Sequence, residues 1–396
     1  MVGHTALLAT LTGAVTVAAT LVGCSSTDQG TQPTSQPSTG PIGATALHDC
    51  PTAAIPAPPT GDAPGGAGAG AGAKIAIASS VAPSDTSTSI VLDNLTGPQI
   101  QCGRTPLDTY SDIVFDTPTS GNGQAKQLKL DIQVPRTPGR KPLVVYLTGG
   151  GFVTAPKENG LNLRSYVAEA GYAVASIQYR TVPDGATFVD GVADAKSAIR
   201  YLRAHADEYR IDPEQVAVWG ESAGGYLASM VGVTAGLGQF DKGANLDRSS
   251  AVQAVVDKFG PSDLAKVAAD FDSATQRAWD QPDNSIAHWA GAAPGRSIVG
   301  DPAADARADP IGYVSHAAPP FLLLHGSADT LVSPSQTLLL HRALRAAGVD
   351  STRYVLTGAN HGDLAFLNDP AAALPWSSQE VMDHIVAFLN SHLTRH

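Results

Sequence analysis

Short apolar runs alternate with amphipathic segments over most of this chain, from about Tyr110 to its end. Strands are expected at 111–115, 127–134, 142–147, 173–178, 215–219, 254–259, 321–325 and 353–356. Helices are expected at 161–170, 189–209, 222–233, 334–347 and 378–392. This alternation predicts an α/β fold with a mostly parallel sheet and helices on both of its faces. Ligands of such sheets bind at the carboxyl ends of the strands, so chemistry is expected in the residues that follow each strand.

A glycine-flanked serine follows the strand at 215–219. The run Gly220-Glu221-Ser222-Ala223-Gly224 has the pattern G-x-S-x-G, and a helix is expected directly after it. Between a strand and a helix, this pattern typically holds a serine on a tight turn with its hydroxyl exposed as a nucleophile. The alternative is a serine that only caps the following helix. The strand before it and the helix after it favour the nucleophile.

A serine nucleophile needs a base that accepts its proton and an acid that orients this base. When the nucleophile lies on such a turn, the chain order is serine, then acid, then histidine. Asp329 and His361 fit this order, and each lies in the loop after an expected strand. Both loops are expected at the same edge of the sheet as Ser222. The sequence therefore predicts Asp329 as the acid and His361 as the base.

Other acids and histidines fit these roles less well. Asp363 is a competing acid, but it lies two residues after His361 and would have to fold back on its own loop. His325 ends a strand and is expected to be structural. The remaining downstream histidines that we considered lie on expected helices: His341, His384 and His392.

The negative charge that develops during acyl transfer needs backbone amides directed at it. One expected donor is Ala223, which follows the nucleophile. The others are Gly150 and Gly151, in a run of three glycines after the strand at 142–147. Glycines let the backbone approach a substrate closely. A glycine-rich surface turn is the alternative, and a phosphate cradle is disfavoured because the run does not match G-x-x-x-x-G-K-[ST].

Taken together, these motifs resemble the α/β-hydrolase carboxylesterases. The branch in question is that of bifunctional feruloyl and acetyl-xylan esterases and of hormone-sensitive-lipase-like enzymes. The resemblance covers about residues 110–396. It is carried by the runs 178–180, 193–196, 198–202, 211–213, 218–225, 259–264 and 319–329.

The resemblance implies an α/β-hydrolase fold and a serine esterase that needs no metal and no cofactor. It assigns the nucleophile, acid and base to Ser222, Asp329 and His361, and the oxyanion donors to Gly150, Gly151 and Ala223. The family usually has His before the three glycines, whereas this chain has Thr148, so the loop lacks its usual support. A small cap with Trp279 and Trp289 is expected at about 265–317, where substrate would be selected.

The first residues indicate export. Residues 1–23 contain no Lys, Arg, Asp or Glu and are mostly apolar, as in a signal peptide. They end in Leu21-Val22-Gly23-Cys24-Ser25, which resembles the bacterial lipobox, so Cys24 is expected to be acylated. A plain signal peptide is the alternative. Residues 24–73 are rich in Ser, Pro, Gly and Ala and are expected to form a disordered tether, followed by an N-terminal extension at 74–109.

If Cys24 carries lipid, then Cys50 and Cys102 remain as an even pair. In an exported protein such a pair is expected to form a disulfide, although two free thiols are the alternative. The net charge of −11, with 25 Lys and Arg against 36 Asp and Glu, argues against a nucleic-acid partner.

The sequence thus predicts a serine esterase for short-chain or acetylated small-molecule esters. It would be exported and lipid-anchored to the outer face of the bacterial cell membrane, with no other membrane contact. Two alternatives remain: a catalytically weak hydrolase-fold lipoprotein that binds envelope components, and a related serine peptidase of the prolyl-oligopeptidase type. The acyl and alcohol specificity and the oligomeric state stay open.

Overall fold

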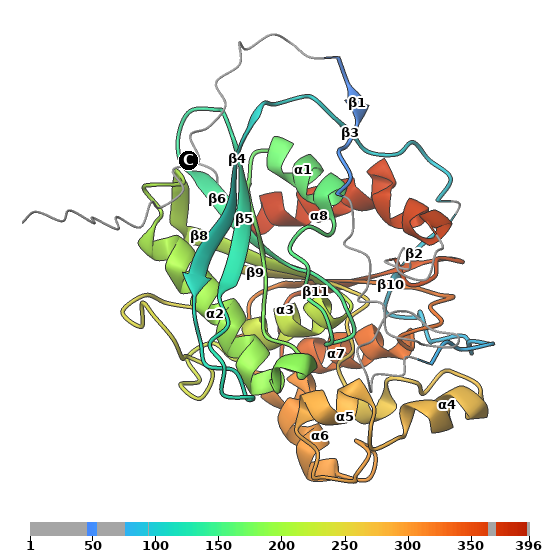
Figure 1. The fold of residues 1–396 in the computed structure, drawn as a ribbon. Coiled ribbons are helices and arrows are strands. Elements are labelled where there is room, and N and C mark those ends of the chain that lie inside the picture. Colours follow the sequence, from blue (N-terminus) through green and yellow to red (C-terminus); the bar gives the residue numbers. More distant parts are fainter. Residues whose placement is uncertain (1–45, 54–75, 94, 363–369, 394–396) are drawn as a thin grey trace, which may run out of the picture. The chain divides into compact units, whose positions relative to one another are not determined.

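The computed structural model describes residues 46–53, 76–93, 95–362 and 370–393 (Figure 1). Within these residues the strands are β1 His48–Asp49, β2 Ile90–Leu92, β3 Gln101–Cys102, β4 Leu107–Asp116, β5 Leu128–Pro135, β6 Lys141–Leu147, β7 Ala173–Ile177, β8 Ile211–Glu221, β9 Ala254–Lys258, β10 Phe321–Gly326 and β11 Ser351–Leu356. The α-helices are α1 Leu161–Glu169, α2 Phe188–Ala204, α3 Ala223–Val233, α4 Ser273–Trp279, α5 Ser285–Ala290, α6 Pro302–Ala308, α7 Ser335–Ala346 and α8 Gln379–His392. Short 3-10 helices are η1 Val182–Asp184, η2 Leu264–Lys266, η3 Pro310–Tyr313 and η5 Pro370–Ser377.

One mixed sheet organises the described part of the chain. Its nine strands follow the order β2-β11-β10-β9-β8-β6-β7-β5-β4. The strands from β2 to β7 in this order pair in parallel, and β5 and β4 each pair antiparallel to their preceding neighbour. Every residue of β6, β7 and β10 is buried, as expected for parallel strands that are covered on both faces. The predicted mostly parallel α/β fold is confirmed.

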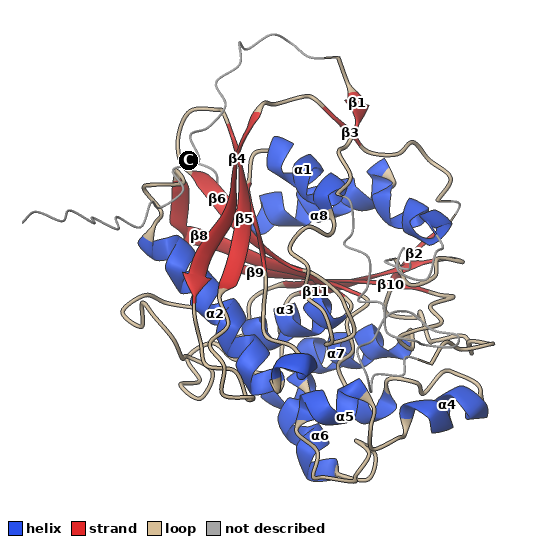
Figure 2. Ribbon diagram, viewed as in Figure 1, coloured by secondary structure: helices blue, strands red, loops and turns tan. Residues whose placement is uncertain are grey.

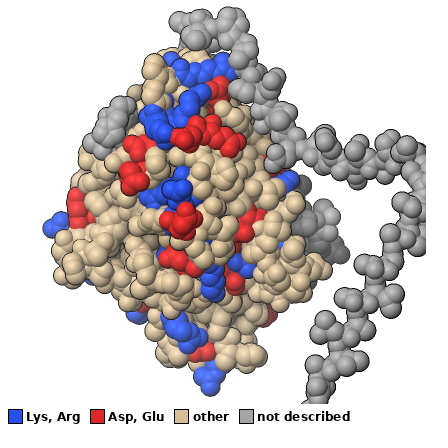
Figure 3. Space-filling model, turned by 90° about the vertical axis from the view of Figure 1, so that its left-hand side faces the viewer, with Lys and Arg blue, Asp and Glu red and all other residues tan. Residues whose placement is uncertain are grey.

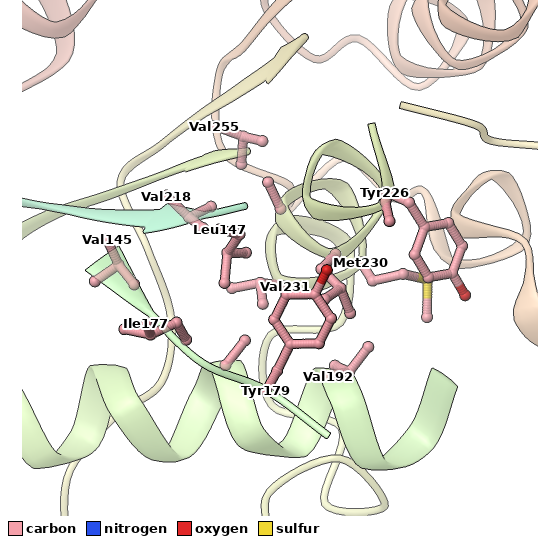
Figure 4. Close-up of a cluster of buried hydrophobic side chains, with 14 of the residues drawn as sticks. Val145, Leu147, Ile177, Tyr179, Val192, Val218, Tyr226, Met230, Val231 and Val255 are labelled. Atoms are coloured by element: carbon pink, nitrogen blue, oxygen red, sulfur yellow. The ribbon is translucent and has the colours of Figure 1, made fainter. Parts of the chain in front are cut away.

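Helices cover both faces of the sheet (Figure 2). On one face, α1 and α8 pack against each other and over the strands, with Leu163, Val167, Ile385 and Leu389 in a shared apolar cluster. On the other face, α2, α3 and α7 form a larger cluster with the opposite sides of the same strands. Figure 4 shows part of this second cluster, in which side chains of α2 and α3 meet those of the central strands.

Most elements lie within a few residues of their predicted bounds, and the largest difference among the helices is at the end of α2. Helix α2 ends at Ala204 rather than at 209, because the chain leaves it in a turn that is closed by a hydrogen bond from Ile211 N to Ala206 O. Arg210 has a φ of 54° in this turn. Strand β8 therefore begins at Ile211 and is longer than the predicted strand at 215–219. Helix α1 ends one residue earlier than predicted.

Residues before Tyr110 also contribute to the sheet. Strand β4 begins at Leu107, and β2 pairs in parallel with β11 and forms the edge of the sheet. Strand β2 and the first three residues of β4 lie within the predicted N-terminal extension at 74–109. A strand of three residues, such as Ile90–Leu92, is too short to show a periodic pattern in the sequence. Its position depends instead on the edge of β11, with which it pairs.

A disulfide joins the predicted tether to the N-terminal extension, and residues 46–53, which were predicted to be part of a disordered tether, are ordered beside it. Cys50 and Cys102 form a disulfide, and β1 pairs antiparallel with β3 beside it. The predicted signal peptide at 1–23, Cys24 and most of the predicted tether at 24–73 lie outside the described residues, as does Asp363. None of the helices in the described ranges is both long enough and apolar enough to span a bilayer.

Charged side chains of both signs share the surface. On the face in Figure 3, Lys and Arg lie between Asp and Glu, and neither sign gathers into a continuous stripe. Ion pairs among the described residues include Arg136–Asp108 at 2.6 Å and Arg210–Asp108 at 2.7 Å.

Candidate active site

Ser222 occupies a strained turn between β8 and α3. Its φ of 56° and ψ of −122° are unusual for a residue with a side chain. The flanking glycines are required by close packing, because a Cβ at Gly220 would lie 2.0 Å from the Gly224 carbonyl oxygen, and one at Gly224 would lie 2.0 Å from the Leu147 oxygen. The glycines of the motif thus let β8, α3 and β6 meet at the serine.

A buried ion pair supports this turn. Lys258 Nζ lies 2.6 Å from Glu221 Oε1, and both side chains are almost fully buried. The backbone oxygen of Lys258 accepts a hydrogen bond from Ser222 N at 2.9 Å. Residues on β8 and β9 therefore fix the position of the Ser222 backbone.

Asp329 and His361 are joined by a hydrogen bond of 2.8 Å between Oδ2 and Nδ1. Both residues are buried, and the other carboxylate oxygen, Oδ1, accepts the amides of Leu331 and Val332 at 2.8 and 2.9 Å. Burial by itself would raise the pKa of the Asp329 carboxyl, but the attraction of His361 and the hydrogen bonds from His325 and His361 lower it below its usual range. Asp329 is therefore an anion at neutral pH and can stabilise a protonated His361.

His325 also contacts this carboxylate, which the sequence analysis did not anticipate. Its Nε2 lies 3.2 Å from Asp329 Oδ2 and 3.0 Å from Val332 O, while its Nδ1 lies 3.0 Å from Thr337 Oγ1. Two oxygen acceptors around Nε2 indicate that this nitrogen carries the proton. The signal in the sequence that could have indicated this contact is the spacing His325-Gly326-x-x-Asp329 at the end of a buried strand.

Ser222 and His361 line one apolar pocket, together with the glycine loop. The remaining lining residues are Gly149, Gly150, Gly151, Phe152, Ala223, Pro261, Val267, Trp279, Ser285, Ile286, Leu331 and Val332. His361 Nε2 is buried in this pocket and has no hydrogen-bond partner among the described residues. The structure thus places the predicted nucleophile, acid and base at one site, with the free imidazole nitrogen available for a proton.

The three predicted oxyanion donors line the same pocket. None of the described residues accepts a hydrogen bond from the amides of Gly150, Gly151 or Ala223. A Cβ at Gly150, whose φ is 148°, would lie 2.2 Å from the Thr154 oxygen, so this loop also needs its glycine. The amides are therefore free to bind a developing oxyanion.

Tyr179 supports this loop at Thr148. Its hydroxyl donates a 2.8 Å hydrogen bond to the Thr148 carbonyl oxygen, and its ring is fully buried in the cluster of Figure 4. Burial raises the pKa of the Tyr179 hydroxyl, so it remains a donor at any physiological pH. The sequence analysis noted Tyr179 within a motif but assigned it no role.

Helices α4, α5 and α6 lie between β9 and β10 in the chain, within the predicted cap at 265–317, and gather at one end of the fold (Figure 1). Trp279 and Ile286 from this segment line the catalytic pocket. Trp289 stacks on Phe152 with ring centroids 4.7 Å apart, so it packs behind the glycine loop. The two tryptophans of the cap therefore have different positions relative to the pocket.

Three carboxylates gather at the base of this segment: Asp263, Asp305 and Asp309. Each has one oxygen that accepts a backbone amide, from Lys266, Ala265 and Leu264 respectively. Asp263 also pairs with Lys266 Nζ at 2.6 Å. These bonds fix the position of the η2 turn. We therefore interpret the three carboxylates as structural residues.

Comparison with protein-family models gives two matches. A model described as BD-FAE matches residues 130–344, and a model of the prolyl oligopeptidase family matches residues 294–396. The first match contains Ser222 and Asp329, and the second contains Asp329 and His361. The first also covers more than half of the chain.

Curated relatives are esterases by name. Esterase LipQ of Mycobacterium tuberculosis is 28% identical over 264 residues, which are 66% of this chain and 60% of that protein. Isoprenylcysteine alpha-carbonyl methylesterase ICME of Arabidopsis thaliana is 28% identical over 273 residues, 68% of this chain and 61% of that protein. The chain thus spans less than two thirds of the length of these relatives.

Solved structures share the fold. A truncated carbohydrate esterase from gut microbiota superposes with a TM-score of 0.61 at 24% identity, over 75% of this chain and 99% of that one. An acetyl ester-xyloside bifunctional hydrolase from Caldicellulosiruptor lactoaceticus gives a TM-score of 0.56 at 23% identity, over 71% and 96% of the two chains.

Proposed function

Because the chain belongs to the BD-FAE family, we propose that it is a serine carboxylic-ester hydrolase. The observation that carries this proposal is the hydrogen-bonded Asp329–His361 pair, whose free Nε2 faces the pocket that also holds Ser222. A base that is hydrogen-bonded to a buried acid, and a strained serine that lines the same pocket as this base, suit acyl transfer through a covalent intermediate.

In the proposed reaction, Ser222 Oγ attacks the ester carbonyl carbon while its proton moves to His361 Nε2. The carbonyl oxygen becomes an oxyanion and is stabilised by the amides of Gly150, Gly151 and Ala223. His361 then gives the proton to the alcohol oxygen, and the C–O bond of the ester breaks. Water attacks the resulting acyl-enzyme with His361 as base, which releases the carboxylic acid and restores Ser222.

Asp329 has two tasks in this sequence. Its hydrogen bond to Nδ1 keeps the imidazole in the tautomer whose Nε2 can accept a proton. Its negative charge, maintained by four hydrogen bonds within the protein, stabilises the imidazolium that forms. The lowered pKa of Asp329 means that it remains ionised while His361 cycles.

Short-chain or acetylated esters are the proposed substrates. The enclosed space beside Ser222 is small, about 40 Å³, and almost entirely apolar, which suits a small acyl group. The carbohydrate esterase and the acetyl ester-xyloside hydrolase among the structural neighbours support acetylated sugars as the class to test.

A lipid anchor at Cys24 and a position on the outer face of the cell membrane are part of the same proposal. Support comes from the apolar segment at 1–23 and from the lipobox-like residues around Cys24. Metabolic labelling with an alkyne fatty acid is expected to mark the wild-type protein and to leave Cys24→Ser unmarked. A labelled Cys24→Ser protein would contradict the anchor.

Ser222→Ala tests the activity. We expect this variant to lose p-nitrophenyl acetate hydrolysis and fluorophosphonate labelling without a lower melting temperature, because the side chain adds no described hydrogen bond to the fold. Ser391→Ala, at an exposed serine on α8, is the matched control and should keep both. Full hydrolysis by Ser222→Ala would show that another serine is the nucleophile.

Two other results would favour the alternatives. A folded wild-type protein that hydrolyses no ester and takes no label would favour a binding protein with the hydrolase fold. Faster cleavage of proline-containing peptide anilides than of any ester would favour a serine peptidase, an alternative that the family match at 294–396 raises.

A further inference from the structure

Trp279 lines two cavities. One is the small catalytic pocket beside Ser222, and the other is a larger cavity of about 500 Å³ between η2 and α4. Among the described residues, only Val267 and Trp279 belong to the walls of both. These two side chains therefore separate the catalytic pocket from the larger space.

The larger cavity has an apolar interior and a polar rim. Its apolar walls come from Leu264, Ala265, Val267, Ala268, Ala269, Trp279, Ile298 and Val299. Its polar members are Lys266, Ser273, Gln276, Arg277 and Asp280, and all five are exposed. Space of this composition suits an alkyl chain better than a charged group, because an alkyl chain loses no hydrogen bonds with water when it enters.

The indole of Trp279 is held in place by packing. Trp279 is the last residue of α4 and is 7% exposed, yet its Nε1 has no hydrogen-bond partner in the described ranges. A buried donor without a partner is unfavourable for the fold, so polar bonding does not explain a tryptophan at this position. The size of its ring, which lies between the two cavities, does explain a tryptophan there.

We propose that Trp279 is the partition that limits the length of the alkyl chain beside Ser222, and that the larger cavity is a latent chain-binding site behind it. This inference rests on the proposed esterase function and specifies its substrate range. Val267 is the other residue that lines both cavities, and its side chain is smaller than that of Trp279. A smaller residue at 279 would join the two cavities.

The test compares the wild-type protein with Trp279→Ala, Trp279→Leu and Trp279→Phe. Two ester series separate the two sides of the substrate: p-nitrophenyl esters from acetyl to decanoyl lengthen the acyl chain, and alkyl acetates from ethyl to octyl lengthen the alcohol. For one of the two series, we expect Trp279→Ala to raise the ratio of kcat/KM for the eight-carbon to the two-carbon chain by roughly tenfold or more.

The other variants make the test specific. Trp279→Leu should move the optimum to intermediate lengths, and it serves as the informative variant if Trp279→Ala does not fold. Trp279→Phe removes the N–H and keeps most of the ring, so its chain-length profile should stay close to that of the wild type. Ala278→Ser, an exposed neighbour on α4 that lines neither cavity, should leave the profile unchanged.

Three results would overturn the inference. The first is a folded Trp279→Ala and Trp279→Leu pair that hydrolyses acetyl esters with the wild-type chain-length ratio in both series. The second is a wild-type protein that already prefers eight-carbon chains, because Trp279 would then block nothing. The third is a wild-type protein without any ester hydrolysis, which contradicts the proposed function and removes the inference with it.

Discussion

Asp329 accepts four hydrogen bonds inside the protein, from two backbone amides and two histidine rings. The ring of His325 is in turn held by Thr337, whose hydroxyl also accepts a hydrogen bond from the buried Arg353 at 3.0 Å. His325 does not reach the pocket, so it acts on the reaction through Asp329. We therefore interpret it as a positioning residue.

His325→Leu is expected to lower kcat by roughly ten- to hundredfold with little change in KM, since a hydrogen bond to a charged group contributes about 1.5–3 kcal/mol. His325→Gln keeps a donor near the same position and should restore part of kcat. Steady-state kinetics together with thermal melting separate the two possible roles. If both variants have a lower melting temperature but keep the wild-type kcat, His325 is only structural.

Asp257 illustrates a buried acid outside the reaction. It is fully buried on β9 and accepts hydrogen bonds from Ser229 Oγ at 2.7 Å and from Gly260 N at 2.8 Å. Burial raises the pKa of its carboxyl to about 6, although these hydrogen bonds act against the rise. The folded protein therefore keeps this proton at pH values where the unfolded chain, with a pKa of about 3.9, has lost it.

Because the folded-state pKa is raised, Asp257 makes the protein less stable as the pH rises from about 4 to about 6, by about 2–3 kcal/mol. Asp257→Asn cannot lose a proton and should remove this decrease. Urea unfolding of both proteins at pH 4, 5, 6 and 7 checks the prediction. An equal slope with pH in both would assign the effect to other groups.

At the scale of elements, the site depends on how closely three of them approach. Strand β6, strand β8 and helix α3 meet around Ser222, and Gly220 and Gly224 leave no room for a Cβ there. The G-x-S-x-G pattern is thus a packing requirement as well as a turn signal. The same pattern predicted the strand, the turn at Ser222 and the helix after it, because these are local features.

Gly224→Ala would place a methyl group 2.0 Å from the Leu147 oxygen and 2.7 Å from the Thr148 oxygen. The oxyanion loop would have to move away from Ser222, so we expect loss of most hydrolysis and a lower melting temperature. Gly238→Ala is the matched control, since a Cβ there meets nothing within 4 Å. An active, stable Gly224→Ala protein would mean that α3 and the end of β6 can move apart at little cost in stability.

At the scale of the whole molecule, the described residues before the predicted hydrolase domain, 46–53, 76–93 and 95–109, are joined to the fold. Strand β2 extends the sheet, and Gln99 bridges to Ser378 at the start of α8. The Cys50–Cys102 disulfide closes a loop with a sequence separation of 52 residues. The described residues of the extension are therefore part of the same folded unit as the central sheet.

In the chain-entropy model, a loop of this length implies that the disulfide stabilises the fold by about 4 kcal/mol. The double variant Cys50→Ser and Cys102→Ser should lose about this much free energy of unfolding while Ser222 keeps its reactivity, because the disulfide is outside the pocket. Urea unfolding without reductant measures the loss. A wild-type stability that does not change on reduction would show that the bond contributes little.

From about residue 110 and outside the cap, sequence alone determined the order of the strands and helices, the position of the serine turn, and the choice of Asp329 and His361, which the structure joins by a hydrogen bond. These features follow from local periodicity and from residue types that come directly after strands. Only the tertiary structure decided the contact of His325 with Asp329, the support of Thr148 by Tyr179, the place of β2 at the sheet edge, and the position of Trp279 between two cavities. Each of these depends on which side chains packing brings together, and no local pattern encodes that.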